Sequence, residues 1–345
     1  MMKKTLAALA MATLLVPGVA CAQGSFEYSF QSPYAGPHVL NVDMYQPIIE
    51  ELKAESNGRL NLNFFYSGTM IRIEDALPSI MNGLLDFGGV NTMYQDTLFP
   101  YSTAFSMPHI ARDSVQASAM FWEAYNSKPE IKAEWDNLFK VLTVWGSDRS
   151  GFFSTKGPIL STEDLQGKRV LVWSGGQVEL IKAWGGSPVQ VSSNETYMAL
   201  QRGMGDVFFG PLPVGVAYKL MEVTTDITIF PASTIFIVNG MNWEVWNELP
   251  KDLQDLLESK FGGEAASIRS GQLLYDSTNR DLQTMVNEGC VIHTLTDAQY
   301  QAFLDADSAY NTDFWMRELA RLGNPDPAGT IKWVFDLSAA TPAAQ

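Results

Sequence analysis

Residues 167–211 hold the feature that most constrains the fold, because glycines divide this stretch into short segments of alternating type. Short apolar β-type runs lie at 170–173, 188–191 and 207–209. Between them, apolar residues recur at helical spacing, and a glycine follows each helical segment. The stretch therefore predicts a strand–helix–strand–helix–strand unit. Ligands of such units bind at the carboxyl ends of the strands.

A second series of the same kind precedes it. Strand patterns at 26–30, 60–65 and 85–90 alternate with helical patterns at 38–53 and 73–81. This order implies a parallel sheet with right-handed crossovers. The chain thus predicts an α/β fold with two lobes, a hinge, and a ligand cleft between the lobes.

The segments between these series complete the expected organisation. Residues 114–140 are predicted to be helical, and so is the whole of 250–289, a length that would span both lobes. The predicted units are residues 1–22 as signal peptide, 26–145 plus 230–280 as N-terminal lobe, 146–229 plus 281–324 as C-terminal lobe, and 325–345 as C-terminal tail.

The first residues predict export. Lys3 and Lys4 precede an apolar run, and Ala22 ends a small-residue cleavage site, as in a secretory signal peptide. Loss of the two lysines would change the formal net charge from −15 to −17. Cys21 as a lipidated N-terminal residue is the alternative, but no leucine stands in the three residues before it. The prediction is a periplasmic protein.

The charge and the motifs exclude several classes of function. A net charge of −15 argues against nucleic acid as a partner. The three histidines, His38, His109 and His293, have no metal-ligand spacing, and Cys290 has no histidine near it in sequence. No nucleophile elbow or P-loop occurs in the sequence. We expect no enzyme, no metal and no cofactor.

The central stretch resembles a known family. GGSPVQVSSNETYMALQRGMGD, from Gly185, is similar to the signature of the DctP-type periplasmic solute-binding proteins of TRAP transporters. The lead-in at 158–168 and three segments of the N-terminal half resemble the same family. The resemblance implies a solute-binding subunit that delivers a small organic solute to TRAP membrane permease subunits. A protein that feeds a sensor kinase is the alternative. Nothing in the sequence specifies an oligomer, and we expect a monomer.

The departures from the family pattern bear on the ligand. Most members bind organic acids through an arginine whose position here is Leu171. The family's common asparagine is Gly210, and its frequent pocket phenylalanine is Ser193. With Trp173 and Phe209, these residues predict an apolar or aromatic cleft and a neutral or weakly polar solute. For Trp173, packing at the hinge is the competing interpretation.

An organic acid anchored by Arg149 is the open alternative for the ligand, although an ordinary surface ion pair is the simpler interpretation of that arginine. The remaining candidates are polar or aromatic residues at predicted strand ends. They are Asn91, Asn239, Tyr34, His38 and Tyr94.

Overall fold

The computed structural model describes residues 24–34, 36 and 38–344. The predicted signal peptide and Cys21 lie outside the described residues.

The N-terminal lobe contains a mixed sheet in the order β2-β1-β3-β10-β4. β1 pairs in parallel with β2 and β3, as the sequence predicts, while β10 is inserted antiparallel between β3 and β4. The strands are β1 Phe26–Gln31, β2 Leu60–Phe65, β3 Phe87–Asn91, β4 Lys140–Gly146 and β10 Phe236–Met241.

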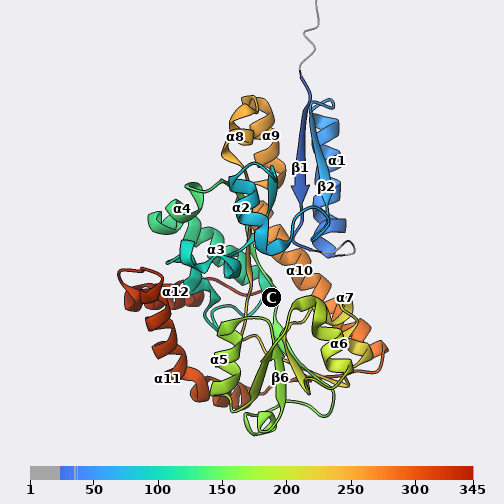
Figure 1. The fold of residues 1–345 in the computed structure, drawn as a ribbon, viewed down its shortest axis with the longest axis vertical. Coiled ribbons are helices and arrows are strands. Elements are labelled where there is room, and N and C mark those ends of the chain that lie inside the picture. The colour runs from blue at the N-terminus through green and yellow to red at the C-terminus, as the bar shows by residue number, and fades with distance from the viewer. Residues whose placement is uncertain (1–23, 35, 37, 345) are drawn as a thin grey trace, which may run out of the picture.

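Helices cover both faces of this sheet (Figure 1). They are α1 Gln46–Glu55, α2 Ala76–Met81, α3 Ser114–Ser127, α4 Pro129–Asp136, α8 Trp243–Glu248 and α9 Lys251–Phe261. Asp113 begins α3 by accepting the backbone N–H of Gln116. The expectation of one helix over 114–140 is wrong, because Lys128 is extended and Pro129 starts a new helix.

The C-terminal lobe contains a second sheet in the order β11-β9-β5-β8-β6-β7. Its strands are β5 Ser150–Ser154, β6 Arg169–Val172, β7 Ser187–Gln190, β8 Val207–Pro211, β9 Asp226–Ile229 and β11 Val291–Thr294. The central unit folds as predicted, with parallel β6, β7 and β8. Its helices, and the short one that follows them, are α5 Gly175–Ala183, α6 Thr196–Gln201 and α7 Val214–Ala217.

The helix predicted over 250–289 is two helices, α9 and α10 (Gly263–Asn287). Gly262 is extended and Gly263 has a φ of +84°, so the backbone turns between them. α10 still spans both lobes: Leu274 packs in the N-terminal core, and Met285 packs in the C-terminal core. The two-lobe α/β fold with a long shared helix is therefore confirmed (Figure 1).

A second long helix also joins the lobes. α11 (Asp297–Arg321) places Phe303 in the C-terminal core and Leu319 in the N-terminal core. The chain beyond 325 folds as α12 (Pro327–Ala340), whose Val334 is buried in the N-terminal core. Ala344, the last described residue, lies beside the start of α3, where its N–H donates to Asp113.

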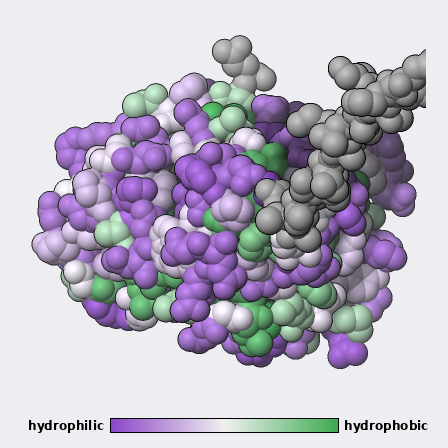
Figure 2. Space-filling model, turned by 90° about the horizontal axis from the view of Figure 1, so that it is seen from above, coloured by the Kyte–Doolittle hydropathy of each residue, from purple (hydrophilic) through white to green (hydrophobic). Residues whose placement is uncertain are grey.

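Short helical turns fill the connections. η1 (Asn41–Tyr45) is a π-helix, and the 3₁₀ turns are η2 Ile73–Asp75, η3 Thr92–Tyr94, η4 Asp96–Leu98, η5 Ser102–Ser106, η6 Glu163–Leu165, η7 Ser193–Glu195 and η8 Leu220–Glu222. Seen from the end that carries α8 and α9, the surface is largely hydrophilic with scattered apolar residues (Figure 2).

Candidate functional site

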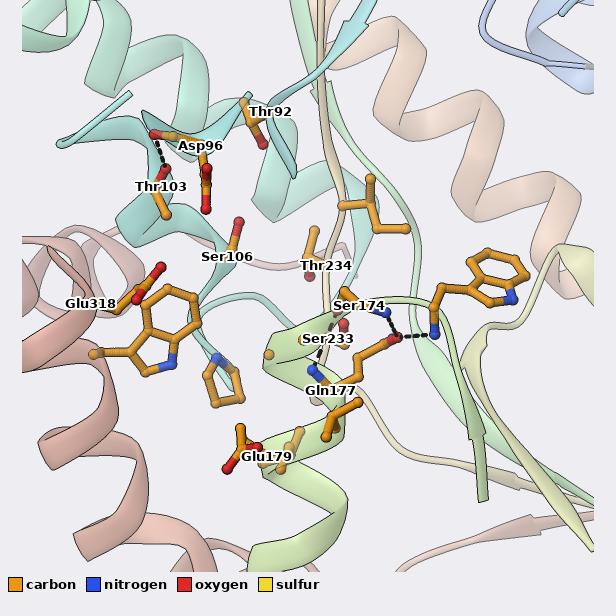
Figure 3. A pocket seen from close by; sticks show the side chains of 18 of the residues that line it. Thr92, Asp96, Thr103, Ser106, Ser174, Gln177, Glu179, Ser233, Thr234 and Glu318 are labelled. Carbon is orange, nitrogen blue, oxygen red and sulfur yellow. Dashed lines mark hydrogen bonds between the residues drawn. The ribbon is translucent and has the colours of Figure 1, made fainter. Parts of the chain in front are cut away.

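The lobes meet where the chain crosses between the sheets. It passes from β4 to β5 and returns from β9 to β10. A cavity of about 430 Å³ lies at this junction. It is lined by the 91–108 region, the start of α5, the returning 232–236 segment and one side of α11 (Figure 3). Of the residues predicted for the site, Asn91 and Trp173 line this cavity.

The start of α5 forms one wall of the cavity. Ser174 caps the helix by accepting the N–H of Gln177, and Gln177 Oε1 in turn accepts the N–H groups of Ser174 and Trp173 (Figure 3). This reciprocal cap fixes the end of β6 against the helix. The backbone of Trp173 is therefore held rigidly at the cavity wall.

Three carboxylates line the cavity, two on the wall opposite α5 and one, Glu179, on α5 itself. Asp96 and Glu318 line the cavity and share the guanidinium of Arg321, which holds the pKa of Glu318 below its usual value. Glu179, also in the lining, is paired with Lys182 at 2.6 Å, and this contact lowers its pKa. Among the described lining residues there is no lysine or arginine.

The side chain of Trp173 belongs to an aromatic group in the C-terminal lobe. Its indole N–H donates to Thr196 Oγ1 at 2.9 Å. Its ring lies 5.0 Å from Phe208 and 6.1 Å from Tyr218. Trp173 therefore connects the cavity to these two rings.

A matching aromatic group lies in the N-terminal lobe, in the loop after β1. The rings of Tyr34 and His38 are stacked at 3.5 Å, and Tyr34 lies 5.4 Å from Trp145. Burial lowers the pKa of His38 to about 3, so the imidazole is neutral at pH 7. We call Tyr34, His38 and Trp145 the N-lobe aromatic group.

Tyr218 brings the two groups together. Burial, helped by nearby Tyr45 and Tyr218, raises the pKa of Tyr34 well above its usual value. Burial, Glu74 and Tyr218 together raise the pKa of Tyr94 to about 12. Burial also raises the pKa of Tyr218, and the Ser193 side chain opposes this shift. Tyr218, which the sequence analysis did not single out, thus lies near Tyr34 of the N-terminal lobe and near Trp173 of the C-terminal lobe.

Three predicted residues lie elsewhere. Leu171 is fully buried in the C-terminal core, and its side chain fills the space above Gly205. Phe209 is fully buried on the other face of the sheet, against Phe152. Gly210 lies under the ring of Phe208, where any Cβ would overlap that ring.

Alternation along the strands explains these positions. Leu171 and Phe208 are register partners on adjacent strands and share one face, whereas Phe209 must point to the opposite face. The aromatic neighbour of Trp173 is therefore Phe208, not Phe209.

Arg149 and Asn239 are engaged within the protein. Arg149 contacts buried Asp148 at 3.2 Å, donates to Asn279 at 2.7 Å and stacks on Tyr275. Asn239 is fully buried and donates to Tyr45 and Thr143. Neither residue lines the cavity.

A smaller cavity of about 210 Å³ lies between His109, α11 and α12. His109 contacts Asp307 at 2.9 Å and Tyr300 at 3.1 Å, and Trp184 also donates to Asp307 at 2.9 Å. These contacts join the N-terminal lobe to α11. The part of the chain that the structure describes contains no group of acidic, histidine or cysteine side chains suited to a metal ion. Within the same residues, no helix combines the length and the apolar character that crossing a bilayer requires.

Two α/β lobes that share two long helices and enclose a cavity define a two-lobe solute-binding protein. The chain belongs to the bacterial extracellular solute-binding protein family 7, whose DctP model matches residues 38–317. The resemblance to TRAP solute-binding proteins is thereby confirmed. Members of this family bind and deliver small solutes outside the cytoplasm, and the expectation that the chain is not an enzyme is confirmed by this membership.

Individual relatives are distant. A solute-binding protein of Albidiferax ferrireducens is 23% identical over 225 residues, which are 63% of this chain and 66% of that protein. A marine-metagenome TRAP solute binding protein specific for aromatic acid ligands, solved with metahydroxyphenylacetate, superposes with a TM-score of 0.84 at 20% identity. That match covers 92% of this chain and 99% of the other. A TRAP solute binding protein of Rhodoferax ferrireducens, solved with copurified benzoate, has a TM-score of 0.81 at 19% identity, with coverages of 92% and 98%. At these identities the structures establish the shared fold.

Proposed function

We propose that this protein is the extracytoplasmic solute-binding subunit of a TRAP-type transporter and that its solute is neutral and aromatic. The solute lies between the lobes, beside Trp173, and hinge closure presents the loaded protein to the membrane permease. Contacts with both lobes would shift an open–closed equilibrium toward the closed form.

One observation carries the choice of a neutral solute: neither expected arginine position offers a free guanidinium. Leu171 is a core residue, and Arg149 is held by Asp148 and Asn279. A carboxylate moved from water into this cleft would lose hydration without gaining a matching charge. Rings from both lobes around Tyr218 supply instead the apolar surface that an aromatic solute requires.

An aromatic acid is the second candidate, because solved relatives of the same fold contain metahydroxyphenylacetate and benzoate. In this chain the acid would have to be anchored by Arg149 after that side chain leaves Asp148.

Arg149→Ala separates the two candidates. Thermal-shift and calorimetric titrations should show that benzamide binds the wild type more tightly than benzoate and that Arg149→Ala leaves the benzamide affinity within threefold of wild type. Arg169→Ala is the matched control, since Arg169 forms an exposed ion pair with Asp206 in the same lobe. If benzoate binds the wild type and is lost only in Arg149→Ala, the acid is the correct solute class.

A further inference from the structure

Within residues 24–34, 36 and 38–344, the imidazole of His38 has one hydrogen-bond donor without a partner. Its ring is stacked on Tyr34 with planes 15° apart, and its Nδ1 accepts the backbone N–H of Leu40 at 3.3 Å. A neutral imidazole that accepts at Nδ1 carries its proton on Nε2. Among the described residues, Nε2 has no hydrogen-bond partner.

The other two histidines show how this chain normally treats an imidazole. His109 is paired with Asp307, and His293 is paired with Asp226, each at 2.9 Å. Among the described residues no carboxylate is paired with His38, and burial is the cause of its lowered pKa. Its ring is therefore kept uncharged.

The surrounding structure positions this ring. The π-helix η1 begins three residues after His38 and turns Asn41 and Tyr45 into the lobe. Such helices are rare and occur often at functional sites. Beneath the loop, Tyr45 accepts from Asn239, whose Oδ1 is buried without a hydrogen-bond partner in the described chain. Because Gly89 has no side chain, the ring of Pro33 can pack where a Cβ would lie, next to Oδ1 of Asn239.

Residues of the C-terminal lobe lie close to the N-lobe aromatic group. Tyr218 is near enough to Tyr34 to affect its pKa, and the ring of Trp173 lies 6.1 Å from that of Tyr218. In the described part of the chain, no lysine or arginine stacks on any of these rings. β1 points toward the C-terminal lobe, so the carboxyl end of this strand faces the lobe boundary (Figure 1).

We propose that His38 Nε2–H is the N-terminal lobe's hydrogen-bond donor to the solute, and that the solute is an aromatic molecule with an uncharged acceptor such as an amide carbonyl or a ring nitrogen. This inference rests on the proposed function. A neutral N–H donor among aromatic rings favours solutes that carry a hydrogen-bond acceptor over solutes that do not, because a buried N–H without a partner costs free energy. A solute without an acceptor would leave Nε2–H unpaired.

The test is isothermal titration of the full-length mature protein with matched probes: benzamide and nicotinamide as neutral acceptors, benzoate and nicotinate as their anionic counterparts. His38→Ala removes the donor, and His38→Gln restores an N–H near the position of Nε2. His293→Gln is the control, because that histidine lies on β11, outside the gathered aromatic residues. Melting temperatures confirm that each variant is folded.

We expect the amides to bind the wild type, His38→Ala to weaken them at least tenfold, and His38→Gln and His293→Gln to stay within threefold of wild type. Amide binding that His38→Ala leaves unchanged would overturn the role of His38 while the proposed function stands. Binding of the carboxylates alone, or of none of the four probes, would overturn the proposed function and this inference with it.

Discussion

Two histidine loops lie at the lobe boundary, and their surroundings differ. His109 sits in a left-handed conformation with a φ of +64°, and both of its ring nitrogens have partners on α11. His38 makes one backbone contact and one ring stack, and its second nitrogen has no partner in the described chain. A non-glycine residue persists in that conformation only when its surroundings hold it there. The comparison indicates a structural joint at His109 and a binding surface at His38.

Asp307→Ala should have the largest effect, and on stability. Asp307 is buried and accepts from both His109 and Trp184, so its loss would leave two buried donors unpaired. Breaking such a network costs about 3–5 kcal/mol. Urea unfolding measures the loss, and Asp305→Ala, an exposed change on the same helix, is the control. A loss of less than about 1 kcal/mol in the free energy of unfolding, as is typical of an exposed ion pair, would contradict the interpretation of His109 and Asp307 as a structural joint.

Trp173→Ala should have the opposite effect to Asp307→Ala: it should weaken solute binding strongly and lower the stability of the fold only a little. The indole is partly exposed, and it borders both the cavity and the Phe208–Tyr218 pair. We expect a loss of at least tenfold in benzamide affinity, and we expect Trp173→Phe to retain part of the binding. Unchanged affinity with lowered stability would make Trp173 a hinge-packing residue, the competing interpretation from the sequence.

Gly210→Ala should affect stability and binding together, by a smaller amount. The new Cβ would overlap the ring of Phe208, which is in contact with Trp173. Overpacking of this kind costs about 1–3 kcal/mol, and the displaced ring would shift Trp173. Gly24→Ala, with open space around it, is the control. Wild-type stability and affinity in Gly210→Ala would show that Phe208 does not position Trp173.

The smallest expected effect is a pH dependence of the melting temperature. The pKa of His38 falls from 6.5 to about 3 on folding, so the unfolded chain binds the proton more tightly between these values. Stability should therefore be unaffected by His38 above pH 6.5 and should fall as the pH drops from 6.5 toward 3. His38→Gln should reduce this slope.

Glu134 acts in the opposite direction, because burial raises its pKa to about 7 and its contribution to stability falls as the pH rises from 4.5 to 7. The difference in melting temperature between His38→Gln and wild type at each pH isolates the contribution of the histidine from that of Glu134. Parallel pH curves for the two proteins would contradict an imidazole of His38 that stays neutral in the folded protein.

The sequence predicted most of the fold because glycines and prolines mark its boundaries. The unit from β6 to β8 is found nearly as expected, since Gly185 and Gly203 adopt the left-handed conformation that ends a helix. The break at Gly262 and the packing of α12 were not predicted. α12 depends on contacts with the N-terminal lobe, which local periodicity does not contain.

The site was predicted in part, for a related reason. Asn91 and Trp173, both at strand ends, line the cavity between the lobes because strand ends face the lobe boundary. That they bind the solute stays a prediction. Tyr218 was missed because its position depends on how α7 packs and how the lobes meet. Alternation along β8 could have indicated Phe208 rather than Phe209, since Phe208 pairs with Leu171 and lies on the same face as Trp173.

The most direct test of a neutral aromatic solute is mass spectrometry of the small molecule released when the purified protein is denatured. A thermal-shift series with that compound and its relatives follows, because binding to the native state must raise the melting temperature. The account predicts an uncharged aromatic compound with a hydrogen-bond acceptor. A released carboxylate whose binding raises the melting temperature would contradict it.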